Sequence, residues 1–92
     1  TRTGQLLGSP GYAAPEQALS GESDARTDVH GLGALLYHLL TGRPPFQAPT
    51  PEAILIQLRE DDPVPPRRQV PGIPADLDTI CLKCLRKLPA NR

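Results

Sequence analysis

The chain is organised around the segment RTDVHGLGALLYHLLT, residues 26–41. Its apolar side chains spread around much of a helix instead of forming one stripe; they are Val29, Leu32, Leu35, Leu36, Leu39 and Leu40, with Tyr37 beside them. A helix that is apolar on most sides belongs in the interior of a larger protein. Gly42 and Pro44-Pro45 then end the helix, because glycine favours helix ends and proline cannot continue a helix. We therefore expect a central buried helix over 26–41.

Other segments also show helical signals. Thr50-Pro51-Glu52 combines a hydroxyl N-cap, a first-position proline and an acid, and predicts a helix over 51–60. The segment 75–88 has the cleanest helical period, with apolar residues at i, i+3, i+4, i+7, i+8 and i+11: Leu77, Ile80, Cys81, Cys84, Leu85 and Leu88. Residues 14–19 suffice for one or two helical turns.

The connections are rich in proline and glycine. The segment 61–74 contains five prolines and is expected to be an extended, rigid connector. No segment shows sustained alternation of apolar and polar residues. The predicted fold class is therefore mainly α, with three to four helices, long loops and no sheet.

Composition excludes several classes of function. Ten basic and ten acidic residues cancel among the 92 residues, which argues against nucleic-acid binding and a polybasic membrane role. With two Tyr, one Phe and no Trp, the chain has few side chains on which bases could stack. The longest apolar run, residues 31–40, is far shorter than a membrane span.

Histidine and cysteine spacing gives little support for a metal site. His30 and His38 lie eight residues apart, which favours structural histidines over ligands. Cys81 and Cys84 form a single CxxC without two further ligands at suitable spacing, so buried helix-packing thiols are the favoured interpretation over a metal module. Their spacing fits a disulfide framework poorly and indicates a reducing cytoplasm.

Four motifs are more specific. Gly8 to Gln17, GSPGYAAPEQ, resembles the end of the activation segment of serine/threonine protein kinases. Asp28 to Gly33 resembles the start of that family's central helix, and residues 39–46, LLTGRPPF, resemble the end of that helix. Residues 80–92 resemble the I-x-x-K-C-L-x-K-x-P-x-x-R signature that closes the catalytic domain. All 92 residues are covered, and the chain resembles the bacterial Hanks-type serine/threonine kinases most.

The resemblance implies roles for individual residues. Ser9 and Tyr12 would belong to the loop that receives the peptide substrate, with the Ser9 hydroxyl bonded to the family's catalytic Asp and Lys. The structural motif positions would be Ala14, Pro15, Glu16, Asp28, Gly33 and Arg92. Asp28 would accept backbone N–H bonds from the catalytic loop; its alternative role is an ordinary acid at a helix start. Thr1 and Thr3 lie where related bacterial kinases are phosphorylated, and are otherwise exposed loop hydroxyls.

The resemblance also implies an ion pair between Glu16 and Arg92. Arg92 is the last residue and no helix follows to hold it. We therefore expect this pair to be weak or frayed in the 92-residue chain and firm in a complete kinase. His30, Gly31 and Ala13 depart from the family pattern, which leaves local packing in doubt.

The groups that perform phosphoryl transfer do not occur in the sequence: a Gly-rich loop, a strand Lys, a catalytic-loop Asp and Asn, and a metal-binding Asp. The chain is therefore expected to begin after the DFG motif, to form the later part of a kinase C-terminal lobe, and to be inactive alone. The complete kinase to which this chain would belong, here called the parent, would transfer the γ-phosphoryl group of ATP, with Mg²⁺, to Ser or Thr of protein substrates. There are two alternatives. The parent could be a pseudokinase, or the chain could be a helical interaction module that uses the Pro-rich segment 61–74.

As domains, we expect 1–92 to be a partial protein kinase catalytic domain. It would comprise the end of the activation segment and the substrate loop (1–19), the central buried helix (26–41) and helices at 51–60 and 75–88. The expected location is cytoplasmic, and a membrane anchor of the parent outside this segment is left open.

Overall fold

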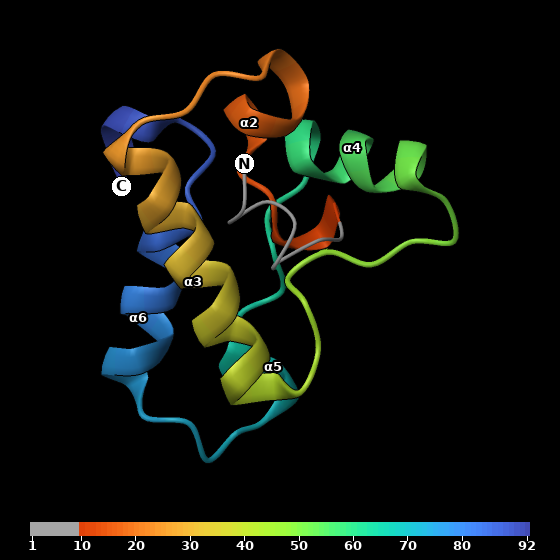
Figure 1. The fold of residues 1–92 in the computed structure, drawn as a ribbon. Coiled ribbons are helices and arrows are strands. Elements are labelled where there is room, and N and C mark those ends of the chain that lie inside the picture. Colours follow the sequence, from red (N-terminus) through yellow and green to blue (C-terminus); the bar gives the residue numbers. More distant parts are fainter. Residues whose placement is uncertain (1–9) are drawn as a thin grey trace.

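The computed structural model describes residues 10–92, and that range is helical and contains no strand (Figure 1). Its α-helices are α2 (Pro15–Ser20), α3 (Ala25–Thr41), α4 (Pro51–Glu60), α5 (Pro66–Gln69) and α6 (Ala75–Cys84). Two 3₁₀ turns, η1 (Pro10–Tyr12) and η2 (Pro89–Asn91), flank them. The mainly α fold class is confirmed.

Helix α3 is the centre of the molecule. It packs along α6 and also contacts α5, η1 and η2. The core between α3 and α6 consists of Ala34, Tyr37, Cys81 and Leu85. In Figure 1 the C-terminus lies beside the start of α3, so the last residues of the chain return to the helix that follows α2.

Local sequence explains where α3 begins and ends. The Asp24 carboxylate accepts hydrogen bonds from the backbone N–H groups of Arg26 and Thr27, and the Thr27 hydroxyl accepts one from the Asp24 N–H. This reciprocal capping box satisfies N–H groups that a helix start leaves unpaired. At the other end Gly42 adopts φ 81°, the left-handed conformation that glycine tolerates best. Helix α4 begins as the sequence predicts, because the Thr50 hydroxyl accepts the Ala53 N–H.

A glycine permits the close approach of α3 and α6. A Cβ added to Gly33 would lie 2.5 Å from the Cys84 Cβ, well inside van der Waals contact. The Cys81 thiol donates to the Gly33 carbonyl across the same contact at 3.5 Å. Burial raises the pKa of this thiol to about 12, so it stays protonated. Both cysteines are free, and Cys81 packs between helices as expected.

The predicted connector over 61–74 was wrong in one respect, because it contains the short helix α5. Pro66 supplies the first helical residue, whose missing N–H costs nothing there. The Asp78 carboxylate of α6 accepts the Arg67 N–H at 3.0 Å. At its far end, the Gln69 amide donates to the Tyr37 hydroxyl, which itself donates to the Val64 carbonyl. These contacts are tertiary, so local sequence does not reveal them.

The predicted helix over 75–88 was too long, because α6 ends at Cys84. Pro89 has no N–H to bond a carbonyl one turn earlier, and it disfavours helical geometry at Leu88. Leu88 is accordingly extended, with φ −86° and ψ 124°. The carbonyls of Arg86 and Lys87 are thereby released from the helix for other partners.

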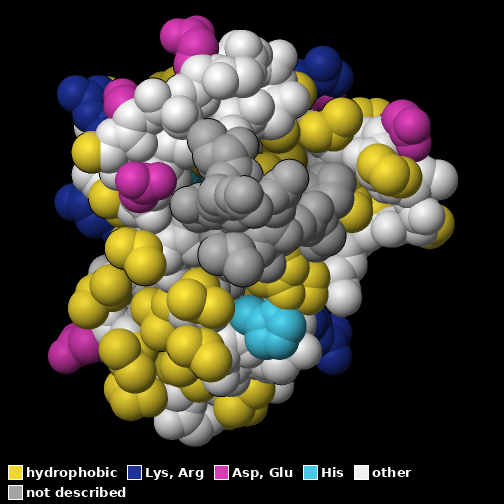
Figure 2. All heavy atoms as spheres, viewed as in Figure 1, with side chains coloured by type: hydrophobic (Ala, Val, Ile, Leu, Met, Phe, Trp, Pro, Cys, Tyr) yellow, Lys and Arg dark blue, Asp and Glu magenta, His cyan; other side chains and the backbone are white. Residues whose placement is uncertain are grey.

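One face of the molecule is apolar and uncovered (Figure 2). The side chains of Leu32 and Leu39 are 65% and 74% exposed, and Leu35 and Ile80 are also exposed. Figure 2 shows hydrophobic side chains gathered over the region where Figure 1 draws α3 and α6. In the described part of the chain, no helix is both long enough and apolar enough for a membrane span.

Candidate functional site

The described part of the expected substrate loop, residues 10–16, is seated against α3 and the loop before α4. Gly11 is buried, and a Cβ there would collide with the Phe46 carbonyl oxygen. Ala14 is 1% exposed, and Pro15, the first residue of α2, is buried. Ser9, Thr1 and Thr3 lie outside the described residues.

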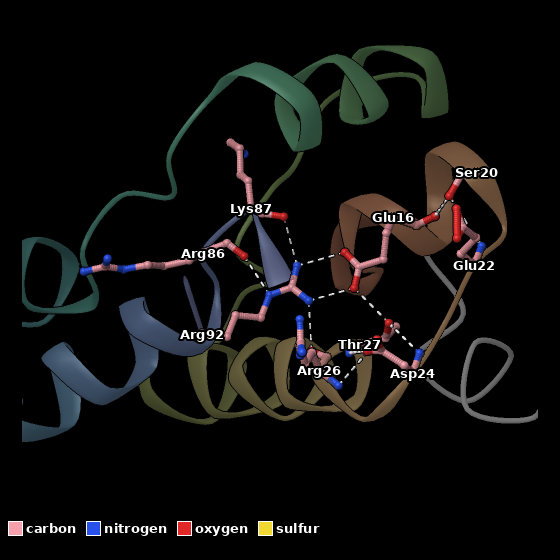
Figure 3. A network of polar contacts seen from close by, with 9 residues as sticks. All are labelled: Glu16, Ser20, Glu22, Asp24, Arg26, Thr27, Arg86, Lys87 and Arg92. Carbon is pink, nitrogen blue, oxygen red and sulfur yellow. Dashed lines mark hydrogen bonds and ion pairs between the residues drawn. The ribbon is translucent and has the colours of Figure 1, made fainter. Parts of the chain in front are cut away.

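The structure brings Glu16 and Arg92 together across 76 positions of sequence (Figure 3). Arg92 Nη1 donates to Glu16 Oε2 at 2.7 Å, and Arg92 Nη2 donates to Glu16 Oε1 at 2.9 Å. This is the two-pronged geometry in which a guanidinium matches a carboxylate. The Arg92 side chain is 1% exposed and that of Glu16 is 18% exposed.

Every N–H of the Arg92 guanidinium has an acceptor. A guanidinium carries five N–H donors. Two bind Glu16, and the remaining three bind the backbone carbonyls of Arg26, Arg86 and Lys87 at 2.9, 2.7 and 3.2 Å. One side chain therefore joins α2, the start of α3 and the segment after α6 (Figure 3). A buried charge is costly unless it is paired in this way.

The expectation that this pair is frayed in the 92-residue chain was wrong. The early end of α6 frees the carbonyls of Arg86 and Lys87, which then accept from Arg92. The turn η2 brings Arg92 back, since its N–H bonds the Pro89 carbonyl at 3.2 Å. The guanidinium is thus held by backbone groups of its own segment, and no following helix is needed.

Hydrogen bonds keep Glu16 ionised. Partial burial raises the pKa of its carboxyl, but hydrogen bonds from Arg92, the backbone and Thr27, together with the Arg92 charge, outweigh burial and lower that pKa to about 2. The Thr27 hydroxyl donates to Glu16 Oε2 at 2.8 Å. Because the same hydroxyl accepts the Asp24 N–H, the cap of α3 and the ion pair share one side chain.

Tyr12 of η1 contacts His38 of α3. The Tyr12 hydroxyl and His38 Nδ1 form a hydrogen bond, and the two rings stack with centroids 5.7 Å apart and planes inclined by 20°. Both residues are half-buried. The sequence favours a structural role for His38 and gives no sign that it pairs with Tyr12.

Asp28 and His30 lie on the first turns of α3 in different environments. Asp28 is exposed, so its carboxylate is accessible to a partner. His30 is 1% exposed, and neither ring nitrogen has a hydrogen-bond partner within the described residues. Burial and the nearby Arg92 charge lower the pKa of His30 to about 4, so the ring is neutral near pH 7. In residues 10–92 no group of His, Cys, Asp and Glu could hold a metal ion.

Comparison with known proteins agrees with this arrangement. The protein kinase domain model matches residues 1–92. The chain belongs to the protein kinase family. It is 45% identical over 92 residues to the serine/threonine-protein kinase PknB of Mycobacterium tuberculosis, covering all of this chain and 15% of the relative. It is 38% and 39% identical to probable serine/threonine-protein kinases of Corynebacterium efficiens and Clostridium acetobutylicum, and covers 14% of each. The chain thus spans about one seventh of the length of the curated relatives that it matches.

Sequence reasoning missed three residues of this kinase segment: Thr27, His38 and Lys87. The Asp24-x-x-Thr27 spacing, a variant of the capping box, was the available signal for Thr27. Lys87 donates to the Gln57 and Leu58 carbonyls at the end of α4 and lies 4.9 Å from the Phe46 ring centroid. No local pattern connects Lys87 or His38 to partners this far away in the chain.

Proposed function

We propose that this chain is part of a protein kinase that transfers the γ-phosphoryl group of ATP to Ser/Thr of proteins, and that it carries the substrate loop and its helical scaffold. The Glu16–Arg92 pair is the observation that carries this proposal. The protein kinase domain model matches all 92 residues of the chain. The pair joins the end of the activation-segment motif to the closing Arg motif, the two most specific motifs of the sequence. It thereby fixes residues 10–16 on the helical base.

The described residues act on position, not on bond making. Arg92 holds the C-terminal end of the loop through Glu16, and the Phe46 carbonyl lies against its N-terminal end at Gly11. Rigid placement of a reacting hydroxyl lowers the entropic part of the barrier. Asp28 is exposed and available to the catalytic loop of the full-length kinase. Ser9 is proposed to bond the catalytic Asp and Lys there.

Nucleotide chemistry is not assigned to this segment. ATP with Mg²⁺ would supply the phosphoryl group. No set of described side chains fits a metal ion, and the sequence has no Gly-rich phosphate loop. We therefore name no ATP-binding or catalytic residue here, and expect the 92-residue chain alone to bind no ATP with micromolar affinity in calorimetry.

Three further assignments belong to this proposal: phosphorylation sites, partners and location. Thr1 and Thr3 are proposed phosphorylation sites, since a phosphate adds about −1.5 to −2 charges that can order a loop against basic side chains. The partners are protein substrates and not nucleic acid, and the location is cytoplasmic.

The test is a phosphotransfer assay on the full-length kinase. The purified protein is incubated with Mg²⁺, γ-labelled ATP and three peptides that differ only in carrying Ser, Thr or Tyr at the acceptor position. Label on the Ser or Thr peptide supports the proposal. Binding of these peptides without any transfer would indicate a pseudokinase, and label on the Tyr peptide alone would contradict the substrate class.

Variants of the same protein test the assigned hydroxyls. Ser9→Ala should lower kcat/KM for the peptide, whereas Ser23→Ala, a change of the same kind at an exposed loop position, should not. Thr1→Ala with Thr3→Ala should lower activity. Full activity of that double variant, with both threonines unmodified in mass spectra of the wild type, would contradict the activation role.

A further inference from the structure

The loop 10–16 is held at three points. Its first point is Gly11, packed so closely on the Phe46 carbonyl that no side chain fits. Its last point is Glu16, fixed by Arg92. The third point lies between them, where the Tyr12 ring stacks on His38 and its hydroxyl bonds His38 Nδ1.

The contact of Tyr12 with His38 differs from the contacts at Gly11 and Glu16 in how many groups hold it. Arg92 binds Glu16 through two charge-assisted hydrogen bonds, and at Gly11 the backbone lies so close to the Phe46 carbonyl that no Cβ fits. In the middle, the Tyr12 ring packs against the core between α3 and α6 and stacks on His38, and its hydroxyl has one hydrogen-bond partner, His38. A neutral hydrogen bond contributes about 0.5–1.5 kcal/mol net, and aromatic contacts contribute a similar amount. The core packing of Tyr12 is apolar and non-directional, so the orientation of its hydroxyl depends on one side chain of α3, His38.

We propose that His38 is a positioning residue for substrate binding, which acts by holding Tyr12 and with it the middle of the loop. This inference rests on the proposed function of that loop. His38 does not contact the reacting atoms; it sets where Tyr12 lies when a Ser/Thr peptide docks. Loss of the contact leaves Tyr12 held by apolar packing alone and loosens the middle of the loop, while Glu16 stays bound to Arg92. Peptide affinity should then fall, and the ATP step should be preserved.

Single-atom and ring-retaining variants of the full-length kinase separate the parts of this contact. Tyr12→Phe removes only the hydroxyl, and His38→Phe keeps a flat ring but removes the nitrogen. His38→Asn places a hydrogen-bonding atom near the position of Nδ1 and should restore part of the contact. Tyr37→Phe is the matched control, because it removes a hydroxyl from the neighbouring residue of α3 that bonds the Val64 carbonyl and the Gln69 amide, not the loop.

The measurement is the dissociation constant of the best peptide from a degenerate Ser/Thr library, with the peptide KM, the ATP KM and kcat measured in parallel. Tyr12→Phe and His38→Phe should each weaken peptide binding about three- to tenfold, the range expected for one lost hydrogen bond. Both should leave kcat and the ATP KM within about twofold, because the contact touches no reacting atom and its loss weakens peptide binding in the ground state and the transition state alike. The double variant should bind no more weakly than the worse single variant, as expected for a shared contact.

Each outcome decides the inference. Recovery of peptide binding in His38→Asn, with an unchanged peptide affinity in Tyr37→Phe, supports the positioning role. Unchanged peptide binding in both Phe variants, or equal losses in the control, would overturn it. Since peptide binding is measured without turnover, a wild type that binds peptide but transfers no phosphate would contradict the proposed function and still test His38.

Discussion

At the scale of single residues, Arg92 is the most constrained side chain described. Its five donors are matched by two carboxylate oxygens and three carbonyls, and its side chain is 1% exposed. A buried pair of this kind adds little stability over apolar packing, but removal of one partner strands the other. The pair therefore contributes to the fold mainly by fixing which residues meet, because it ties the activation-segment motif to the closing Arg motif.

A double-mutant cycle tests the pair in the full-length kinase. Arg92→Ala should lower the free energy of unfolding by about 3–5 kcal/mol, because it leaves the partly buried Glu16 carboxylate without its charge partner. Glu16→Ala combined with Arg92→Ala should cost less than the sum of the two single changes. Denaturant titration of the four proteins gives the coupling energy. A value near zero would show that the two charges do not stabilise one another.

His30 predicts a pH dependence of stability. Its folded pKa of about 4 lies below the ordinary value of 6.5, so the unfolded chain binds the proton more tightly. Stability is therefore fully present above pH 6.5 and falls by up to about 1.4 kcal/mol per pH unit as the pH drops towards 4. Glu16 loses its contribution only lower, between 4.5 and about 2. In the full-length kinase, His30→Phe should flatten the plot of Tm against pH between pH 7 and 5. An equal slope of Tm against pH in wild type and variant would contradict a neutral buried ring.

At the scale of elements, the contact between α3 and α6 depends on Gly33. Gly33→Ala places a methyl 2.5 Å from the Cys84 Cβ and 3.4 Å from its backbone carbon, which cannot move without shifting α6. Overpacking costs about 1–3 kcal/mol, which exceeds the roughly 1 kcal/mol that alanine gains in helix propensity. The Tm of the kinase should fall. Gly72→Ala is the control, since nothing lies within 4 Å of the added Cβ, and an equal effect there would contradict the argument.

The sequence predicts most helix boundaries because their causes are local. Asp24, Gly42 and Thr50 act within a few residues, and the helices they delimit agree with the prediction to within one residue. Helix α5 was missed because its stabilising partners, Asp78 and Tyr37, lie on other helices. The end of α6 was placed at the wrong residue because apolar periodicity continues through Leu88, whereas α6 ends at Cys84 and Leu88, which precedes Pro89, is extended.

One contact of the candidate site was predictable from the sequence and another was not. The resemblance to the kinase family implied the pair of Glu16 and Arg92, which periodicity alone could not do for residues 76 positions apart. The contact of Tyr12 with His38 had no such signal, because neither residue type nor spacing marks it. Ser9, Thr1 and Thr3 stay predictions.

At the scale of the whole molecule, the uncovered apolar face limits what the 92-residue chain can do alone. Burial of one leucine contributes about 1.5–3 kcal/mol, and the exposed Leu32 and Leu39 forgo most of it. We expect the isolated chain to bind an apolar dye, melt broadly and aggregate. Leu32→Ser with Leu39→Ser should reduce aggregation of the isolated chain and destabilise the full-length kinase, where these side chains are expected to be covered. A sharp cooperative melt of a wild-type monomer would contradict this.

Residues 10–16 are proposed to seat the protein substrate, and photo-crosslinking tests this role most directly. The probe is the best Ser/Thr library peptide with a photoreactive phenylalanine analogue beside the acceptor, bound to the full-length kinase, irradiated and mapped by mass spectrometry. Competition by unlabelled peptide identifies the specific cross-links. We expect the specific cross-links within this segment to fall on residues 8–17. Specific cross-links confined to α4, α5 or α6, with none on residues 8–17, would show that the loop held by Arg92 and His38 does not receive the substrate.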